Sequence, residues 1–351
     1  MLRIVVDPVN PDPDIMSQAG NILRRGGLVA FPTETVYGLG ADALNPGAVS
    51  GVYRVKGRPS DNPLILHGNS MEQLKKVAIF PSDPNSDAHK LAEAFWPGPL
   101  TMVLDKGNQL KGVSQKTVAV RVPSHPVSRA LIHFSDCIIA APSANKSGRP
   151  SPTQAWHVEE DFDFERPQTY KISESGGIDL LIDGGIDLPI DGGIDLLIDG
   201  GPTHAGLEST VVDLHTGTPR LLRPGAVTLE MLRLVLDEIE LTKAMGDEEP
   251  DQQPLSPGMK YRHYAPQAPL ILLIGSPEDV RAKAKCYGSK AGFLPSAGQD
   301  PGDIARDLFN NLRQLDRDGV SVIVAEGVRE EGIGLAIMNR LKKAAAEVIF
   351  L

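Results

Sequence analysis

The sequence predicts an α/β protein made of a larger unit followed by a smaller one. Short apolar runs alternate with stretches of helical periodicity, and a Pro-rich segment without such periodicity divides the chain. The 351 residues are enough for two or three domains. We therefore expect a first unit at 1–240, a linker at 241–268 and a small second unit at 269–351.

The first unit is expected to hold a mixed sheet with helices between its strands. Apolar residues at helical spacing predict a helix from Ile15 to Leu23, which Gly26 stops, and another around Val52, which Gly57 ends. Further helices are expected at 83–95, 126–134 and 228–238, and strands at 28–31, 63–67, 100–104, 118–122 and 137–141, with two more, joined by a glycine turn, in 209–223.

Three near-identical octads interrupt this pattern: GGIDLLID (176–183), GGIDLPID (184–191) and GGIDLLID (192–199). Calcium-binding arrays are also rich in Gly and Asp, but their repeat has nine residues and a different Asp spacing. A metal-binding array and a duplicated strand-and-turn segment are thus the two interpretations. Because three octads are too few for a solenoid core, we expect the last copy to supply a strand and the others to loop out.

The residues beyond the linker predict a compact parallel sheet with helices. One expected helix carries Ile304, Leu308, Leu312 and Leu315 on one face. The remaining elements are strands at 270–274, 291–294 and 320–325 and helices at 277–285 and 334–346.

The formal net charge of -10 is unevenly distributed along the chain. Residues 1–150 carry 16 Lys and Arg against 12 Asp and Glu, whereas residues 151–351 carry 19 against 33. A basic first part attracts phosphate, and the acidic remainder favours solubility, although charge alone names no partner.

Cysteine usage and hydropathy predict a cytoplasmic protein. Cys137 and Cys286 lie far apart, as ordinary thiols of a reducing compartment do. No apolar run reaches 18 residues, and Asp and Pro interrupt the N-terminal segment, so a membrane span and a secretion signal are both poorly supported.

Several common functional motifs are absent. The dipeptide Gly-Lys does not occur, which excludes a Walker A phosphate loop, and neither HExxH, paired CxxC nor GxSxG is present. Gly38 and Gly40 match the start of a dinucleotide fingerprint, but no expected strand leads from them directly into a long helix. We therefore regard that match as accidental.

Polar loops at the expected strand ends form the candidate site, because ligands of open α/β sheets bind there. FPTETVYGLG (31–40) offers hydroxyls, and KGRPSDNPLILH (56–67) places an ammonium and a guanidinium that together suit a polyphosphate. APSANKSGRPSPT (141–153) adds hydroxyls, an amide and two cations. Each loop also fits an ordinary turn, cap or surface segment.

Single polar residues elsewhere are ambiguous in the same way. Arg121 alternates with valines in a strand, and the pattern alone favours solvent over a polar cavity. Ser209 and Arg223 are similar, and SPGMKYRHYAP (256–266) either covers a site as a lid or bridges two units. Taken together, these residues predict a cationic, hydroxyl-rich cavity for a nucleotide and a small polar co-substrate.

Seven blocks, in this order, resemble the YrdC-type threonylcarbamoyl-AMP synthases: FPTETVYGLGADA, YRVKGRPSDNPLILH, WPGPLTMVL, VAVRVPSHP, APSANKSGRPSPT, DGGPTHAGLESTVVDL and LLRPGAVT. They span roughly residues 15–230, and SPGMKYRHYAP with the tail resembles the longer, two-domain form. The resemblance implies a YrdC-like twisted mixed sheet around a large cavity, a linker that covers the active site, and a small Rossmann-like α/β domain.

The resemblance also implies a reaction. L-threonine, bicarbonate and ATP, with Mg²⁺ as cofactor, give threonylcarbamoyl-AMP, pyrophosphate and water. A partner transferase complex then modifies tRNAs that read codons beginning with A, and direct tRNA binding by this chain is left open.

The resemblance assigns the site residues in three sets. Lys56 and Arg58 stabilise the triphosphate and are the expected catalytic pair. The ATP-binding set comprises Lys56, Arg58, Asn62, Thr117, Ser143, Asn145, Ser151, Arg223, Tyr261 and His263. The threonine-binding set comprises Thr35, His67, Arg121, Ala141 and Ser209.

Two other functions compete with this one. An RNA-binding scaffold would use the basic loops without catalysis, but the basic excess is slight and only 17 aromatic residues are available for stacking. Carbamoyl-adenylate chemistry of the hydrogenase-maturation type would use a similar domain. Such chains are expected to carry acylphosphatase-like and zinc-finger segments, which are not visible here.

Overall fold

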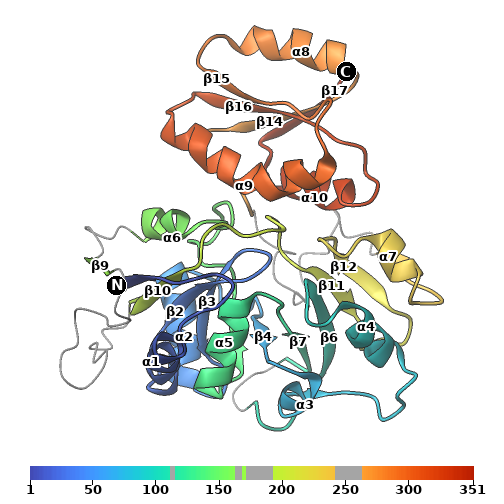
Figure 1. The fold of residues 1–351 in the computed structure, drawn as a ribbon. Coiled ribbons are helices and arrows are strands. Elements are labelled where there is room, and N and C mark those ends of the chain that lie inside the picture. Colours follow the sequence, from blue (N-terminus) through green and yellow to red (C-terminus); the bar gives the residue numbers. More distant parts are fainter. Residues whose placement is uncertain (111–114, 163–167, 171–192, 242–262) are drawn as a thin grey trace.

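Two sheets organise the computed structural model, which describes residues 1–110, 115–162, 168–170, 193–241 and 263–351. A 13-stranded mixed sheet lies in the lower part of Figure 1, and a four-stranded parallel sheet lies above it. The mixed α/β architecture and the parallel second sheet were both predicted from the sequence.

The strands of the large sheet run in the order β13-β12-β11-β6-β7-β4-β8-β3-β2-β10-β1-β9, and β5 pairs with β6. From β13 to β4 their bounds are Glu240–Leu241, Arg220–Arg223, Thr210–Asp213, Leu100–Lys106, Thr117–Arg121 and Ile65–His67. From β8 to β9 they are Ile139–Ala140, Tyr37–Asp42, Val29–Pro32, Leu196–Asp199, Leu2–Val5 and Gln168–Tyr170, and β5 is Ala78–Ile79.

The segment 31–40 is a strand-to-strand hairpin rather than a strand-to-helix loop. Strands β2 and β3 pair antiparallel, with Phe31 opposite Gly38. The hydroxyl of Thr33 donates to the carbonyl of Val36 at 2.7 Å and accepts from the amide of Thr35 at 3.2 Å, which closes the turn. The glycines looked like loop residues, but here they let the aromatic ring of Phe31 lie against the strand.

The last octad supplies a strand, as predicted. Residues Leu196–Asp199 form β10, which pairs in parallel with β1 on one side and with β2 on the other. The first two octads lie outside the described residues, so the prediction that they loop out is not tested. Strand β1 was not predicted, although Asp7 and Pro8 follow it closely, because its run is short and contains Arg3.

Helices cover both faces of the large sheet. Helix α1 (Pro13–Arg24) is capped by Asp12, whose carboxylate accepts from the amides of Asp14 and Ile15. It packs beside α5 (Pro126–Ser135) over one apolar cluster (Figure 1). The second cluster lies on the opposite face. The other helices are α2 (Pro46–Lys56), α3 (Met71–Leu74), α4 (Asp87–Phe95), α6 (Ala155–Asp161) and α7 (Leu229–Arg233), the last being shorter than expected.

The small sheet has the order β15-β16-β14-β17 and is parallel throughout. Its strands are Ala291–Leu294, Val322–Glu326, Leu270–Ile274 and Glu347–Phe350, of which β17 was not predicted. Helices α9 (Pro301–Arg317) and α10 (Gly334–Ala344) lie on the side facing the large sheet (Figure 1). Helix α8 (Pro277–Ala284) and the 3₁₀ turn η1 (Lys285–Tyr287) cover the other side.

The two units make close contact at Gly206. This residue has φ +71°, and a Cβ atom there would lie 2.3 Å from the backbone of Arg306 on α9. The next residue, Leu207, is fully buried in the apolar cluster of the small unit beside Phe309. The segment that leads into β11 is therefore held against α9.

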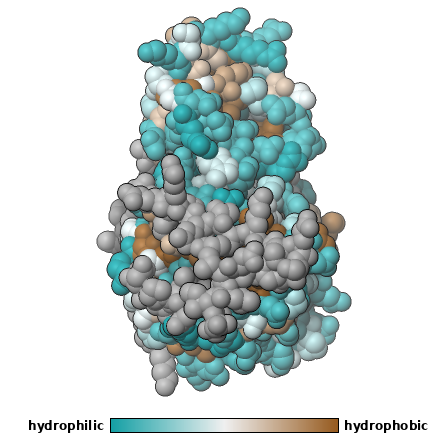
Figure 2. Space-filling view, turned by 60° about the vertical axis from the view of Figure 1, so that its left-hand side comes forward, coloured by the Kyte–Doolittle hydropathy of each residue, from teal (hydrophilic) through white to brown (hydrophobic). Residues whose placement is uncertain are grey.

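The visible surface of the small unit is mainly hydrophilic, with scattered apolar side chains (Figure 2). Within the described ranges no helix combines the length and the apolar character needed to cross a membrane.

We predict that Gly206→Ala lowers the midpoint of thermal unfolding more than Gly217→Ala does. Both glycines have positive φ, +71° and +87°, so each alanine costs about 1 kcal/mol of backbone strain. Only at residue 206 would the methyl group also meet backbone atoms of α9, since nothing lies within 4 Å of the Cβ position at residue 217. Scanning calorimetry measures both midpoints, and equal shifts would contradict the close approach.

Candidate active site

One pocket lies where the large sheet meets His263 and Tyr264, which precede β14. The space within it is about 630 Å³, the part open to solvent included. It is lined by Thr33, Thr35, Val36, Gly38, Arg58, Ile65, His67, Arg121, Ala141, Pro142, Ser143, Asn145, Arg149, Ser151, Glu208, Ser209, Arg223, His263 and Tyr264. Nearly all of these side chains come from strand ends or from the loops that follow them.

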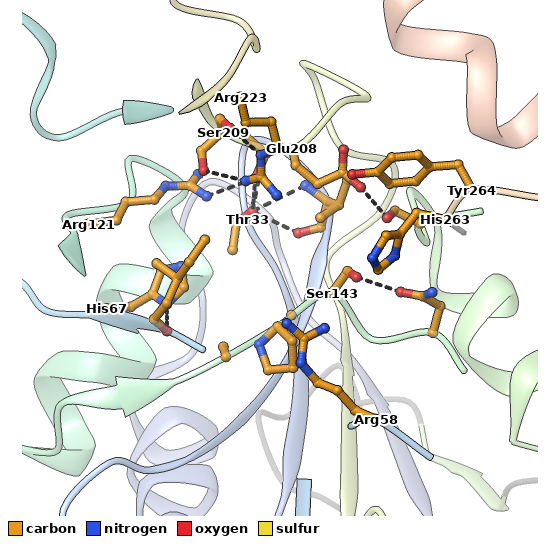
Figure 3. Close-up of a pocket in the computed structure, with 18 of the residues that line it drawn as sticks. Thr33, Arg58, His67, Arg121, Ser143, Glu208, Ser209, Arg223, His263 and Tyr264 are labelled. Atoms are coloured by element: carbon orange, nitrogen blue, oxygen red, sulfur yellow. Dashed lines mark hydrogen bonds between the residues drawn. The ribbon is translucent and has the colours of Figure 1, made fainter. Parts of the chain in front are cut away.

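His67 and Arg121 form one side of the pocket (Figure 3). They are register partners at the ends of the parallel strands β4 and β7, so the sheet itself brings them together. Burial, and the nearby charge of Arg121, lower the pKa of His67 to about 3, and the imidazole is therefore neutral at physiological pH. A neutral ring beside a fixed cation suits a small anionic ligand.

Arg121 is 3% exposed, so the solvent-facing position that the strand pattern favours is wrong. Its guanidinium donates to the hydroxyl of Thr35 at 3.0 Å and to the carbonyl of Gly98 at 3.2 Å, and it forms an ion pair with Glu34 at 2.7 Å. The two hydrogen bonds use two of its five N–H groups, and its Nη2 atom, although close to Glu34, has no hydrogen-bond partner among the described residues. Burial raises the pKa of Glu34, but the charge of Arg121 outweighs it and the net shift is downward.

Arg58 lies on another side of the pocket, below His263 in Figure 3. Helix α2 ends at Gly57, whose φ of +60° turns the chain and directs the next residue inward. The guanidinium donates to the carbonyl of Asn62 at 3.1 Å, to its side-chain oxygen at 2.6 Å and to the carbonyl of Pro63 at 2.8 Å. These acceptors are neutral, so they orient the cation without cancelling its charge.

Lys56 lies behind the pocket wall rather than in it. The ammonium is 3% exposed and donates to the backbone carbonyls of Ser143 and Asn145. Burial, and the repulsion of Arg58, lower its pKa well below the usual value. The loop after β8 is thereby fixed, and the hydroxyl of Ser143 donates to the side-chain oxygen of Asn145 at 2.5 Å.

Ser151, Glu208, Ser209 and Arg223 form a third group. The hydroxyl of Ser151 donates to the carboxylate of Glu208, and Arg223 donates to the carbonyl of Ser209 at 3.0 Å and to its hydroxyl at 3.1 Å. Burial raises the pKa of Glu208, whereas the charges of Arg340 and Arg223 lower it, and the net shift is downward. The group therefore contains one carboxylate that stays ionised.

His263 and Tyr264 cover the pocket opposite His67 (Figure 3). Burial and the charge of Arg58 lower the pKa of His263 to about 3, and its buried Nε2 atom has no hydrogen-bond partner among the described residues. Tyr264 packs on Phe309 with ring centroids 5.4 Å apart. The unpartnered ring nitrogen is available to a ligand.

The structure brings together most of the residues that the sequence assigned to the site. Lys56 and Asn62 instead support pocket residues from behind, Thr117 begins β7 and is not among the lining residues, and Tyr261 lies outside the described residues. Arg149, Glu208 and Tyr264 line the pocket and Glu34 pairs with Arg121, but none of the four was assigned to the site from the sequence. Glu34 and Glu208 stand within the blocks that carry the resemblance, but a search for cations and hydroxyls passes over carboxylates.

The pocket residues that the structure describes do not form a cluster of metal ligands. Glu34 and Glu208 are ion-paired with Arg121 and Arg340, and the described residues contain no group of three or more His, Cys, Asp or Glu side chains placed to hold an ion. The arrangement fits a magnesium ion that arrives bound to ligand phosphates, since Mg²⁺ commonly keeps its waters and binds through substrate phosphates. Chemically, the pocket can hold a polyanion near Arg58 and a carboxylate near Arg121.

Comparison with known proteins identifies relatives over nearly the whole chain. Residues 21–169 match the Sua5, YciO and YrdC family model, described as telomere recombination, and residues 227–346 match the model of the threonylcarbamoyl-AMP synthase C-terminal domain. The threonylcarbamoyl-AMP synthase of Pyrococcus abyssi is 46% identical over 93% of both chains. That of Bacillus subtilis is 40% identical over 97% of this chain and 96% of the relative. The crystal structure of P. abyssi Sua5 complexed with L-threonine superposes with a TM-score of 0.85 at 43% identity, over 100% of both chains.

We predict that Lys56→Met loosens the loop after β8. Methionine keeps an unbranched side chain that is one atom shorter but removes the ammonium, and two carbonyls lose a buried donor at a cost of about 1–3 kcal/mol. Amide hydrogen exchange, followed by mass spectrometry over residues 141–150, should accelerate about tenfold or more. Lys146→Met is the matched control because Lys146 is exposed on the same loop, and equal exchange in both variants would argue against the anchoring role.

Proposed function

The chain belongs to the family of threonylcarbamoyl-AMP synthases, which are nucleotidyltransferases, and from this premise we propose the reaction it catalyses. It joins L-threonine, bicarbonate and ATP into threonylcarbamoyl-AMP and releases pyrophosphate and water. The product serves a transferase complex that modifies tRNAs reading codons that begin with A. The enzyme works in the cytoplasm, in keeping with its free cysteines.

The observation that carries the proposal is the division of one pocket into two sides. Arg121 and His67 lie at one side, with N–H groups and a neutral imidazole for the carboxylate and the body of threonine. Arg58, Ser143 and His263 lie at the other and suit the charged and polar groups of ATP. A single cavity thus holds both substrates within reach of one another.

The reaction needs alignment and charge stabilisation more than a strong base. The amine nitrogen of threonine attacks bicarbonate or dissolved carbon dioxide, forming an N–C bond and a carbamate, with loss of water where bicarbonate is used. A carbamate oxygen then attacks the α-phosphorus of ATP, and the bond to the pyrophosphate oxygen breaks. Arg58 stabilises the charge that develops on the phosphates.

Lys56 contributes by holding the loop of Ser143 and Asn145, and Mg²⁺ enters with the phosphates of ATP and shares their charge. Asn62, Thr117, Ser151, Arg223 and Tyr261 remain assigned to ATP, and Thr35, Ala141 and Ser209 to threonine. Asn62 acts on ATP through the guanidinium of Arg58 that it orients.

Burial argues against an RNA-binding scaffold as the alternative function. Lys56, Arg121 and Arg223 are 3%, 3% and 5% exposed, and buried cations cannot follow a phosphate backbone across a surface. A small ligand that enters the pocket can reach the cations that line it.

Release of pyrophosphate from ATP tests the proposed reaction when threonine and bicarbonate are omitted in turn. We expect release with all three substrates, and a rate at the level of the protein-free control when either is absent. The Arg58→Ala variant should lose at least about tenfold in rate, because one charge-stabilising group is removed from the transition state. Release that does not depend on threonine would overturn the assignment.

We predict that Arg121→Lys raises the Michaelis constant for threonine by about tenfold or more and leaves that for ATP within about twofold. Lysine keeps the charge but cannot hold Glu34, Thr35 and a carboxylate with one planar fork. Arg233→Lys on the exposed face of α7 is the matched control. An increase confined to ATP would place Arg121 on the nucleotide side instead.

A further inference from the structure

Two buried arginines of the small unit reach the loops that form the pocket. Arg340 on α10 is 1% exposed and Arg313 on α9 is fully buried. A buried guanidinium carries a desolvation cost of several kcal/mol, which is offset only by well-placed acceptors. Apart from the side chain of Asn339, the acceptors of both arginines belong to the first unit. Two of them, Pro150 and Pro224, directly neighbour Ser151 and Arg223, which are assigned to ATP.

Arg340 donates three hydrogen bonds to the first unit, the longest from its Nη2 atom to the carbonyl of Glu208 at 3.4 Å. Its Nε atom donates to Oε2 of Glu208 at 3.0 Å, and its Nη1 atom donates to the carbonyl of Pro224 at 2.5 Å. Glu208 lines the pocket, and Pro224 directly follows Arg223, which also lines it. The guanidinium therefore ties the segment before β11 to the segment after β12.

Glu208 connects Arg340 to Ser151 through the two oxygens of its carboxylate. One carboxylate oxygen accepts from Arg340, and the other accepts from the hydroxyl of Ser151. Because the hydroxyl hydrogen of Ser151 is directed at Glu208, the oxygen presents lone pairs to the pocket and can accept from an O–H or N–H group of a ligand. The orientation of Ser151 thus depends on a carboxylate that Arg340 fixes.

Arg313 contacts the backbone of the same loop, directly before Ser151. It donates to the carbonyl of Pro150 at 2.6 Å and to both oxygens of Asp161 at 2.9 and 2.8 Å. Pro150 directly precedes Ser151. The small unit therefore restrains the backbone before Ser151 through Arg313 and the side chain of Ser151 through Arg340 and Glu208.

We propose that Arg340 is a positioning residue for ATP: through Glu208 it orients Ser151, and in this way the small unit sets the affinity of the first unit for the nucleotide. This inference rests on the proposed function, because Ser151 is assigned to ATP there. It gives the small unit a part in substrate binding rather than in stability alone.

Steady-state pyrophosphate release by the full-length protein tests the proposal, with ATP and threonine varied separately. Arg340→Met should raise the Michaelis constant for ATP by about tenfold or more, which corresponds to ~1.4 kcal/mol, and leave that for threonine within about twofold. Arg317→Met is the matched control: Arg317 lies over the Trp156 ring at 4.5 Å, across the same interface but away from the pocket, and both constants should stay unchanged.

A double-mutant cycle separates positioning from mere support. If Arg340 acts through Ser151, the combination of Arg340→Met and Ser151→Ala should raise the ATP constant by less than the product of the single effects. Strictly multiplicative effects, or an equal rise of both Michaelis constants together with a lower thermal midpoint, would overturn the proposal.

If Arg340→Met does not fold, the Michaelis constant for ATP is measured in Arg340→Lys and Glu208→Gln instead. Lysine keeps a charge for Glu208 but cannot serve Glu208 and Pro224 together, and glutamine removes the charge that Arg340 holds. Unchanged ATP constants in both variants would overturn the proposal. A wild-type protein that releases no threonine-dependent pyrophosphate would refute the proposed function instead, and calorimetric binding of ATP to the same variants would still decide the role of Arg340.

Discussion

Positive charge buried around the pocket is the constraint on which the site depends. A buried cation is tolerated only when nearby acceptors replace its lost hydration, and here each cation has acceptors on a neighbouring segment. Lys56 fixes the loop after β8, Arg121 holds the hairpin at Glu34, and Arg340 holds Glu208. The hydrogen bonds and ion pairs that offset the desolvation of these cations therefore also hold the pocket loops in place.

Much of this arrangement could be predicted because it follows local rules. Apolar periodicity, capping residues and Gly or Pro at the ends of runs located most helices and strands, and loops at strand ends located the pocket. The hairpin of β2 and β3 was missed because Gly38 and Gly40 are poor strand formers in isolation and are suited to this strand by the ring of Phe31, a contact across the hairpin. The burial of Arg121 was likewise invisible, since its partner Glu34 is 87 residues away in sequence.

The octad repeat shows a second limit of local pattern. A shift by eight residues keeps the alternation of side chains between the two faces of a strand, so periodicity cannot choose among the copies. A strand built from GGIDLPID would place Pro189 where Leu197 stands, between β1 and β2, and would lose a ladder hydrogen bond. The copies GGIDLLID are identical, and the one used for β10 lies nearer in sequence to the loop that carries Ser209.

Arg58 and the two buried arginines of the small unit serve different purposes, and their acceptors distinguish them. Arg58 donates to neutral oxygens of Asn62 and Pro63, so its charge remains for a ligand. Arg340 and Arg313 donate to the carboxylates of Glu208 and Asp161, so these pairs add little net charge to the pocket while they join the units. Since a polyanionic ligand responds to net charge, the small unit can adjust the geometry of the pocket without altering its attraction for phosphate. An acidic chain can thus hold a cationic site, because the acceptors of Arg58 are neutral and leave its charge uncompensated.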